Sequence, residues 1–265
     1  MCGIFGAFLK NGQAAPVVHA ALKRLEYRGY DSVGEAIMDD GKLYVKKDAG
    51  KIDDVHALLN LDDLPGQIGM GHTRWATHGA PYRVNAHPHT DCGEEMAVVH
   101  NGIIENFADL KIELEVRGHV FSSKTDTEVI AHLIEDKMKE GLPLAEAVRE
   151  AVNRLDGSYA IAVVSTKEPD KIVCARRESP LVIGVSDDAV YCSSDIPAFL
   201  PLTNRAVVIE NGELVILSEK GYEIRKLSDW SLVSREPEMI DWSPEMAEKM
   251  GYPHFMLKEI YEQPS

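Results

Sequence analysis

The chain has 265 residues, of which 45% are hydrophobic and 27% charged, a composition typical of an ordinary globular protein. Its net charge of −15 argues against non-specific binding to nucleic acid or to an anionic membrane surface, and we expect neither partner. No apolar run approaches the roughly 18–20 residues that a membrane-spanning helix needs. The length suffices for one large domain or two small ones.

The cysteines and the N-terminus bear on the cellular compartment. The N-terminus lacks the charged and apolar regions of a secretory signal peptide, and no two cysteines form a C-x-x-C motif. A reducing compartment is therefore expected, and we predict a cytoplasmic protein. The four cysteines are Cys2, Cys92, Cys174 and Cys192.

The first hundred residues predict mainly strands. One helix interrupts them, because Pro16 begins a segment with apolar residues at helical spacing and Gly29 follows as a stop signal. Residues 39–41 read Asp-Asp-Gly, which is typical of a hairpin turn. We expect strands at residues 2–9, 33–38, 42–46, 68–73 and 96–100.

Helices are predicted for the middle of the chain. Thr125 and Glu128 match the capping-box pattern, in which the first residue caps a helix and the fourth reaches back to it. Gly118 follows the first predicted helix and Gly141 follows the second, and each is a stop signal. The three helices are expected at about residues 106–117, 125–140 and 143–155.

The remainder of the chain predicts short strands in quick succession, and periodicity fades after about residue 234. Two sheets with helices packed outside them would bury every apolar face of such a chain. We therefore predict the α+β class, as a four-layer α/β/β/α sandwich of two mostly antiparallel sheets. The late strands are expected at residues 158–166, 171–177, 181–186, 189–194, 206–210 and 213–219.

Cys2 follows the initiator methionine directly. If Met1 is removed, this one residue carries both a thiol, with a pKa of about 8.5, and an α-amine, with a pKa of about 7.7–8.0. Near neutral pH the amine can accept the proton that the thiol must lose, so the residue can act as nucleophile and base together. The alternative is an unremarkable residue at a disordered terminus.

A second cluster covers residues 71–79, directly after a predicted strand. Arg74 offers a planar fork that suits a carboxylate, and Trp75 could cover a small ligand. The cluster also fits a surface loop with one arginine and a half-buried tryptophan. From these residues alone, the two interpretations are about equally supported.

Two further sites admit both a chemical and a structural interpretation. The Asn101 amide and the Gly102 N–H can converge on one oxygen, as in an oxyanion hole, but an Asn-Gly pair also forms plain turns. Asp126 can hold a substrate ammonium group, but an aspartate in the first turn of a helix also stabilises the helix dipole.

Five histidines fall between residues 72 and 100, so a zinc site is conceivable. No cysteine pair supports it, and the spacing is not that of a metalloenzyme helix. We therefore predict no metal and no cofactor, and histidines that form ordinary hydrogen bonds near a polar pocket. The five are His72, His78, His87, His89 and His100.

Taken together, these motifs resemble the class II glutamine amidotransferase domain, which is an N-terminal-nucleophile hydrolase. The matching phrases run from residue 2 to residue 132 and continue with SPLVIG and SSD between Ser179 and Asp195. Within the class, HTRWATHG and the tail HFMLKEIYEQP are most similar to the glucosamine-6-phosphate synthases. The phrases of the first half are MCGIFG, RLEYRGYDS, GHTRWATHG, NAHPH, VVHNGIIEN and KTDTEVIAH.

The resemblance implies a role for each candidate residue. Cys2 would attack the side-chain amide of L-glutamine, and Asn101 and Gly102 would hold the oxyanion. Arg74, aided by Thr77 and His78, would bind the substrate carboxylate, Trp75 would shield the ammonia, and Asp126 would bind the substrate ammonium group. Residues 73–81 would close as a lid. Support of the N-terminus and the pocket is expected from Arg28, Gly29 and His87.

The same resemblance implies a glutaminase domain at residues 2–235 and a linker at residues 236–265 leading to synthase domains that this chain lacks. The intact enzyme would be a homo-oligomer that feeds ammonia into hexosamine synthesis. Val33 and Glu35 depart from the small and apolar residues usual after RGYDS. The alternatives are a glutaminase domain of amidophosphoribosyltransferase, asparagine synthetase or glutamate synthase type, or a non-catalytic glutamine-sensing domain.

Overall fold

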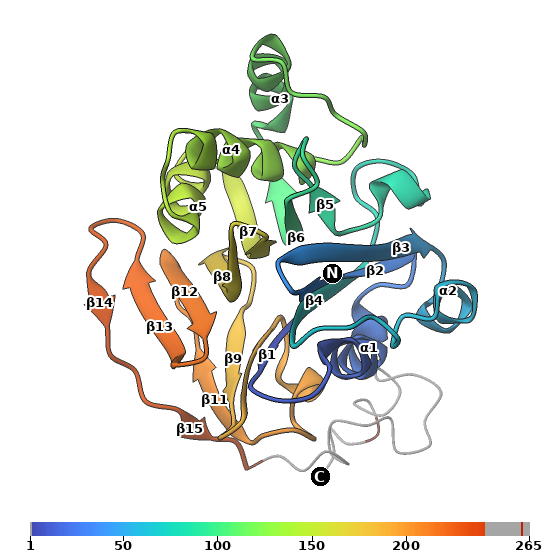
Figure 1. Ribbon diagram of the computed structural model, residues 1–265, viewed down its shortest axis with the longest axis vertical. Helices are drawn as coiled ribbons and strands as arrows, with labels where there is room; N and C mark the ends of the chain where they lie inside the picture. Colours follow the sequence, from blue (N-terminus) through green and yellow to red (C-terminus); the bar gives the residue numbers. More distant parts are fainter. Residues whose placement is uncertain (1, 242–260, 262–265) are drawn as a thin grey trace.

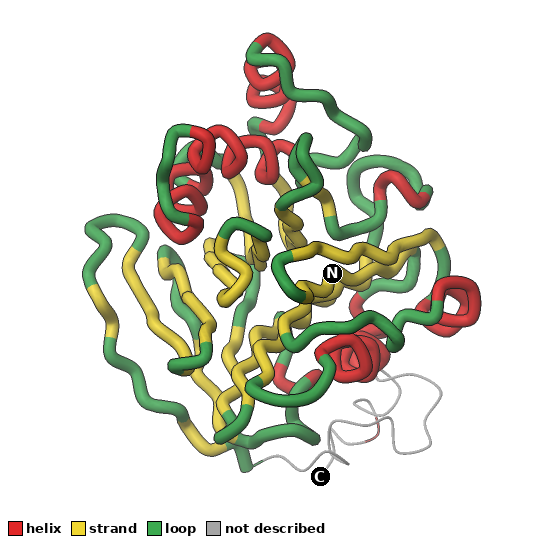
Figure 2. The backbone as a smooth tube through the Cα atoms, in the orientation of Figure 1, coloured by secondary structure: helices red, strands yellow, loops and turns green. Residues whose placement is uncertain are grey.

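The computed structural model describes residues 2–241 and residue 261. Within them, strands form two sheets, and every pairing between neighbouring strands is antiparallel. Figure 2 shows the strands running from the middle of the molecule to its left side, with the helices at the top and right.

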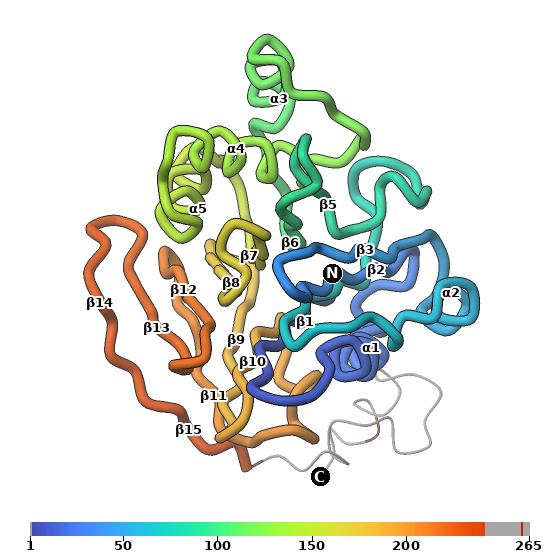
Figure 3. Tube along the Cα trace, in the orientation of Figure 1, coloured from blue at the N-terminus to red at the C-terminus, as the bar shows by residue number. Residues whose placement is uncertain are grey.

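The first sheet has the strand order β15-β11-β9-β10-β1-β4-β2-β3. It joins segments that are far apart in the sequence, because strand β1 near the N-terminus pairs with the much later β10, as Figure 3 shows by colour. Its strands are β1 Gly3–Leu9, β2 Ser32–Asp39, β3 Lys42–Ala49, β4 Ile68–Arg74, β9 Val182–Val185, β10 Ala189–Ser193, β11 Arg205–Val208 and β15 Glu238–Met239.

The second sheet has the order β14-β13-β12-β8-β7-β6-β5. Its long strands β6 and β7 are mostly buried and rich in valine, isoleucine and alanine, as expected for strands covered on both faces. Its strands are β5 His89–Thr90, β6 Met96–Ile104, β7 Gly157–Ser165, β8 Glu168–Arg177, β12 Glu213–Ser218, β13 Gly221–Lys226 and β14 Leu232–Val233.

Helices cover the outer face of each sheet (Figure 1). One buried cluster packs α1 and α2 against the first sheet, a second fills the space between the sheets, and a third packs α3, α4 and α5 against the second sheet. The predicted four-layer α/β/β/α sandwich is therefore confirmed. The helices are α1 Ala14–Leu25, α2 Ile52–Leu59, α3 Phe107–Val116, α4 Glu128–Lys139 and α5 Leu144–Val152, with short 3-10 turns η1 Glu26–Arg28, η2 Arg83–Asn85 and η3 Ile196–Ala198.

Helix α4 begins differently from the expected capping box. Its N-cap is Thr127 rather than Thr125, and no side chain caps it. The Thr125 hydroxyl lies 3.0 Å from His89 Nε2, and the Glu128 carboxylate accepts the backbone N–H groups of Ser122 and Ser123 at 2.7 Å each. The capping-box prediction is wrong, because the glutamate bonds the loop before the helix and not the cap residue.

Glu35 is an acid in the core beneath α1 and α2. It lies on β2 with no exposed surface, on the same face as Val33 and Ile37, and its two carboxylate oxygens have no hydrogen-bond partner among the described residues. The cross-strand neighbour Lys46 binds Asn60 and Asp63 instead. Burial raises the pKa of Glu35 to about 9. The side chain is therefore protonated at neutral pH.

Candidate functional site

Cys2 lies directly before β1, which runs between β10 and β4 near the middle of the first sheet. Its thiol sulfur accepts the backbone N–H of Trp75 at 3.2 Å, just beyond the end of β4. Its carbonyl oxygen accepts two further bonds, from Arg28 Nε at 2.9 Å and from Asn101 Nδ2 at 3.0 Å. The second residue is thus fixed by groups from three separate parts of the chain.

Burial raises the pKa of the Cys2 thiol above its ordinary value. The Trp75 N–H and the positive charges of Arg74 and Arg28 act in the opposite direction, but they do not outweigh the loss of solvent. The thiol therefore stays protonated at neutral pH. A reaction at this sulfur needs a base close to it.

Asn101 and Gly102 lie on β6, which continues to Ile104 rather than ending at His100 as expected. His72 Nε2 lies 3.0 Å from Asn101 Oδ1 and 3.0 Å from the His100 carbonyl oxygen. Both partners are acceptors, so Nε2 carries the proton, and this contact directs the amide nitrogen of Asn101 toward Cys2.

Gly102 has a φ of 135°, a conformation that residues with a side chain rarely adopt. A Cβ atom there would come within 2.0 Å of the Ser158 carbonyl oxygen on the neighbouring strand. Only glycine therefore fits this position without strain.

Arg74 is the last residue of β4 and is almost fully buried. Its Nη2 donates to the carbonyl oxygen of His78 and, at 3.1 Å, to that of Gly79, so the guanidinium holds the following loop. Its Nη1 is buried and has no hydrogen-bond partner among the described residues. One prong of the fork is therefore free to bind a ligand.

The other residues predicted around Arg74 are more open. Trp75 is 45% exposed and packs edge-on against Tyr30, with ring centroids 5.4 Å apart. Thr77 is exposed, and the His78 ring packs against Phe107 at 5.2 Å, so His78 contacts Arg74 through its backbone and not its imidazole.

Asp126 is buried just before α4, and its Oδ2 accepts the backbone N–H of Ile104 at 2.8 Å. The carboxylate therefore ties the loop before α4 to the end of β6, three residues beyond Asn101. It does not cap the helix, which begins at Glu128.

Arg28 and Gly29 support the N-terminus. Arg28 bonds the Cys2 carbonyl and also pairs with Asp195, whose Oδ2 lies 2.9 Å from Nη1. A Cβ on Gly29 would come within 2.5 Å of the Arg74 backbone carbon, so the absence of a side chain lets the two segments touch. Tyr27 Oη donates to the same Asp195 oxygen at 2.5 Å.

Buried imidazoles underlie this region. The rings of His72 and His87 stack with centroids 4.0 Å apart, and His87 packs edge-on against His89 at 4.8 Å. The Thr127 hydroxyl lies 2.9 Å from both His87 Nε2 and His100 Nδ1. Burial lowers the pKa of His72 to about 3 and lowers those of the other three as well, so all four rings are neutral at pH 7.

Comparison with known proteins decides the family. A family model described as a glutamine amidotransferase domain matches residues 74–201. A glutamine–fructose-6-phosphate aminotransferase (isomerizing) from Methanothermobacter thermautotrophicus is 55% identical over 266 residues, covering all of this chain and 44% of the relative. A protein of the same name from Pyrococcus horikoshii is 52% identical over 264 residues, with the same shares covered. The chain belongs to the class II glutamine amidotransferases.

Solved structures agree with this amidotransferase assignment. The glutamine phosphoribosylpyrophosphate amidotransferase from B. subtilis matches with a TM-score of 0.74 and 29% identity, over 86% of this chain and 50% of that one. A structure described as the allosteric regulatory enzyme of purine biosynthesis matches with a TM-score of 0.75 and 29% identity, over 86% and 49%. The chain therefore spans about half the length of the amidotransferases that it matches.

Some contacts at this end of the amidotransferase domain were not predicted from the sequence. His72 was expected only to form ordinary hydrogen bonds, and it orients the Asn101 amide. Asp195, which holds Arg28, and Thr127, which joins two of the buried histidines, were not given a role. The phrase SSD, which ends at Asp195, carried part of the resemblance, but its contact with Arg28 depends on the pairing of β1 with β10.

No helix among the described residues is long and apolar enough to span a membrane.

Proposed function

We propose that this domain hydrolyses L-glutamine to L-glutamate and ammonia, with Cys2 as the nucleophile. The observation that carries the proposal is the convergence on Cys2 of the Trp75 N–H, which touches the thiol, and the Asn101 amide, which touches the carbonyl. A sulfur held by a fixed donor, on a residue whose backbone is also held in place, suits attack on an amide carbon.

The proposed chemistry begins with removal of Met1, which frees the α-amine of Cys2. That amine takes the thiol proton while sulfur bonds to the side-chain amide carbon of glutamine. The tetrahedral oxyanion is held by Asn101, whose amide nitrogen has a second N–H besides the one bonded to Cys2, and by the Gly102 N–H. The carbon–nitrogen bond then breaks, the amine returns its proton to the leaving nitrogen, and ammonia departs. Water hydrolyses the remaining γ-glutamyl thioester to glutamate.

Substrate recognition would involve both charged ends of glutamine. The unpartnered Nη1 of Arg74 suits the α-carboxylate, with Thr77 and His78 beside it, and the buried carboxylate of Asp126 suits the ammonium group. A site that pairs both charges would reject simple amides, because a buried charge without a partner is costly.

The segment of residues 73–81 would act as a lid over the bound glutamine, with Trp75 shielding the ammonia. Arg74 holds this segment at the carbonyls of His78 and Gly79, and Asn85 Nδ2 donates to the Ala80 carbonyl at 2.8 Å. Arg28, Gly29 and His87 would hold the N-terminus and the residues of the substrate site in place.

In the whole protein, the ammonia would pass to a synthase part that makes glucosamine 6-phosphate from fructose 6-phosphate. The identity of about 50% to relatives with the matching name favours this acceptor over those of other amidotransferases. The glutaminase domain would occupy residues 2–235 and a linker residues 236–265, most of which lie outside the described residues. We expect a cytoplasmic homo-oligomer.

The proposed function is tested by comparing two preparations of the full chain, one with Met1 removed by co-expressed methionine aminopeptidase and one with Met1 retained. N-terminal sequencing identifies each. The processed form should release ammonia from glutamine, with a rate that rises as the α-amine loses its proton near its ordinary pKa of about 7.7–8.0. Equal rates from the two forms would exclude the α-amine as the base.

Arg74→Lys should raise the KM for glutamine by roughly 10- to 100-fold while kcat changes little. A lysine ammonium can still donate to one loop carbonyl, but it cannot also bind the substrate carboxylate as the second guanidinium nitrogen does. The lost contact is a hydrogen bond to a charged group, which is worth about 1.5–3 kcal/mol. Steady-state kinetics measure both constants. Arg83→Lys, at an exposed position in the nearby η2, is the matched control and should leave KM unchanged. An unchanged KM in Arg74→Lys would remove Arg74 from the substrate site.

A further inference from the structure

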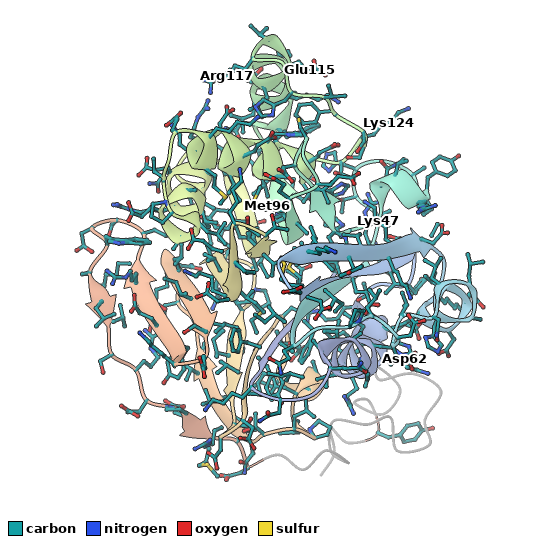
Figure 4. All side chains as sticks on the ribbon, viewed as in Figure 1. Lys47, Asp62, Met96, Glu115, Arg117 and Lys124 are labelled. Carbon is teal, nitrogen blue, oxygen red and sulfur yellow. The ribbon has the colours of Figure 1, made fainter. Side chains whose placement is uncertain are left out.

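Four potential metal ligands meet on the helical side of the second sheet, away from Cys2. Cys92 lies in the turn between β5 and β6, His119 follows α3, and His132 and Glu135 are three residues apart on α4, so they share one face of that helix. One ligand atom from each lies within 4.8 Å of all the others. Figure 1 shows the three elements that contribute them, and Arg117, labelled in Figure 4, marks the nearby end of α3.

The distances between the ligand atoms match a tetrahedral zinc shell. Zinc bonds of about 2.0–2.3 Å at tetrahedral angles place neighbouring nitrogen and oxygen ligands about 3.4 Å apart, and sulfur about 3.6 Å from nitrogen. The Cys92 sulfur lies 3.6 Å from Nδ1 of both histidines, and these two Nδ1 atoms are 3.2 Å apart. Glu135 Oε2 lies 3.0 Å from each of them.

The outer nitrogens of both histidines face carboxylates. His119 Nε2 lies 2.7 Å from Asp136 Oδ1, and His132 Nε2 lies 3.8 Å from Glu128 Oε1. Metal-binding histidines commonly donate their second N–H to a carboxylate as His119 can, which leaves a lone pair on the other nitrogen for the metal. The separation at His132 is too long for a hydrogen bond, and its Nε2 has no partner among the described residues. With the protons on Nε2, two lone pairs, a carboxylate oxygen and a thiol sulfur point at one another, an arrangement that suits a cation between them.

The same region offers a fully protonated alternative. If both imidazoles are positively charged, Glu135, Asp136 and Glu128 can balance them, with Lys139 bonded to Glu135 Oε1 at 2.6 Å and Arg117 to Asp136 at 3.0 Å. This alternative gives no role to the thiol, and it makes two N–H groups whose nitrogens are 3.2 Å apart share one acceptor, Glu135 Oε2. A metal accounts for all four ligand atoms.

We propose that Cys92, His119, His132 and Glu135 bind one zinc ion in a structural site. A thiolate, two neutral imidazoles and a carboxylate neutralise the charge of Zn²⁺, and four protein ligands fill a tetrahedral shell, as in closed structural sites. The ion joins the β5–β6 turn, the segment after α3 and the middle of α4. The start of that same helix carries Thr127, which contacts two of the buried histidines beneath the proposed nucleophile.

The test is metal analysis of the full chain after incubation with one equivalent of Zn²⁺ and removal of unbound metal. Wild type should retain about one zinc per chain, and Cys92→Ser and His119→Ala should retain little. Co²⁺ in place of zinc should give a thiolate-to-cobalt absorption band that Cys92→Ser loses. Wild type that retains no zinc and shows no such band would overturn the proposal. None of these measurements depends on glutaminase activity, so they are independent of the proposed function.

Two further variants sharpen the test. Asp136→Asn removes only the carboxylate behind His119, and it should weaken zinc binding by about 10- to 100-fold without abolishing the cobalt band. His56→Gln is the matched control, because His19, His56 and Asp62 form the other group of possible ligands among the described residues. It should retain one zinc per chain. Loss of zinc from His56→Gln, with zinc kept by Cys92→Ser, would move the ion to that other group and refute the proposed site.

Discussion

Cys2→Ala should reduce glutamine hydrolysis by at least about a thousandfold while the protein still folds and binds glutamine. The side chain supplies the only atom that bonds to the substrate in the proposed reaction, and loss of a nucleophile typically costs several orders of magnitude in kcat. The backbone contacts of Cys2 with Arg28 and Asn101 run through its carbonyl oxygen, which alanine retains. An ammonia-release assay measures the rate, and calorimetry measures binding.

The control for this prediction is Cys174→Ala. Cys174 lies on β8, fully buried between the two sheets and remote from the Trp75 loop, so its loss should leave the rate close to that of wild type. A Cys2→Ala enzyme that works within tenfold of wild type would exclude covalent catalysis by this residue. Loss of glutamine binding together with activity would instead give Cys2 a role in shaping the pocket.

Glu35→Gln should stabilise the protein relative to wild type, and the gain should grow as the pH rises. The folded-state pKa of about 9 lies above the ordinary value of about 4.3. Between these values the folded state keeps a proton that the unfolded state has lost, so the contribution of Glu35 to stability is greatest below pH 4.3 and falls by about 1.4 kcal/mol per pH unit up to pH 9. Glutamine does not titrate, and the variant should therefore gain about 2 kcal/mol on wild type between pH 7 and 9.

Urea unfolding of both proteins at several pH values measures this difference, and the other titrating groups do not disturb it because both proteins share them. Glu213→Gln is the matched control. Glu213 is also buried, but Arg235 binds both of its oxygens at 2.7 and 2.9 Å, so its replacement should destabilise the protein at every pH. A Glu35→Gln difference that stays constant from pH 7 to 9 would show that Glu35 is already ionised in the folded protein.

Most of the fold could be predicted because its signals are local. Apolar runs predicted the long strands, and apolar residues at helical spacing predicted the helices α1, α3, α4 and α5, to within a few residues. Helix α2 was missed, since its eight residues are fewer than the roughly 11–18 over which helical periodicity is recognised. The capping box failed for a different reason, because Glu128 found stronger donors in the preceding loop than at the predicted cap.

The candidate site could be predicted only as a set of residues. Nothing in the sequence indicates that the Asn101 amide donates to the Cys2 carbonyl. Nor does it indicate that one guanidinium nitrogen of Arg74 donates to its own loop while the other has no partner among the described residues. Such contacts depend on how the sheets pair. The proposed zinc ligands were missed because three separate elements supply them, and only His132 and Glu135 lie at a recognisable spacing.

Mild acid should be a hazard for this protein because four uncharged imidazoles are packed beneath Cys2. Below about pH 6.5 the unfolded chain binds protons at His72, His87, His89 and His100. The folded protein leaves these four rings neutral, because their folded-state pKa values are depressed. Each further step toward acidity then favours the denatured chain at four positions at once. Storage and crystallisation are accordingly best attempted from neutral solutions, where the histidine layer has nothing to titrate.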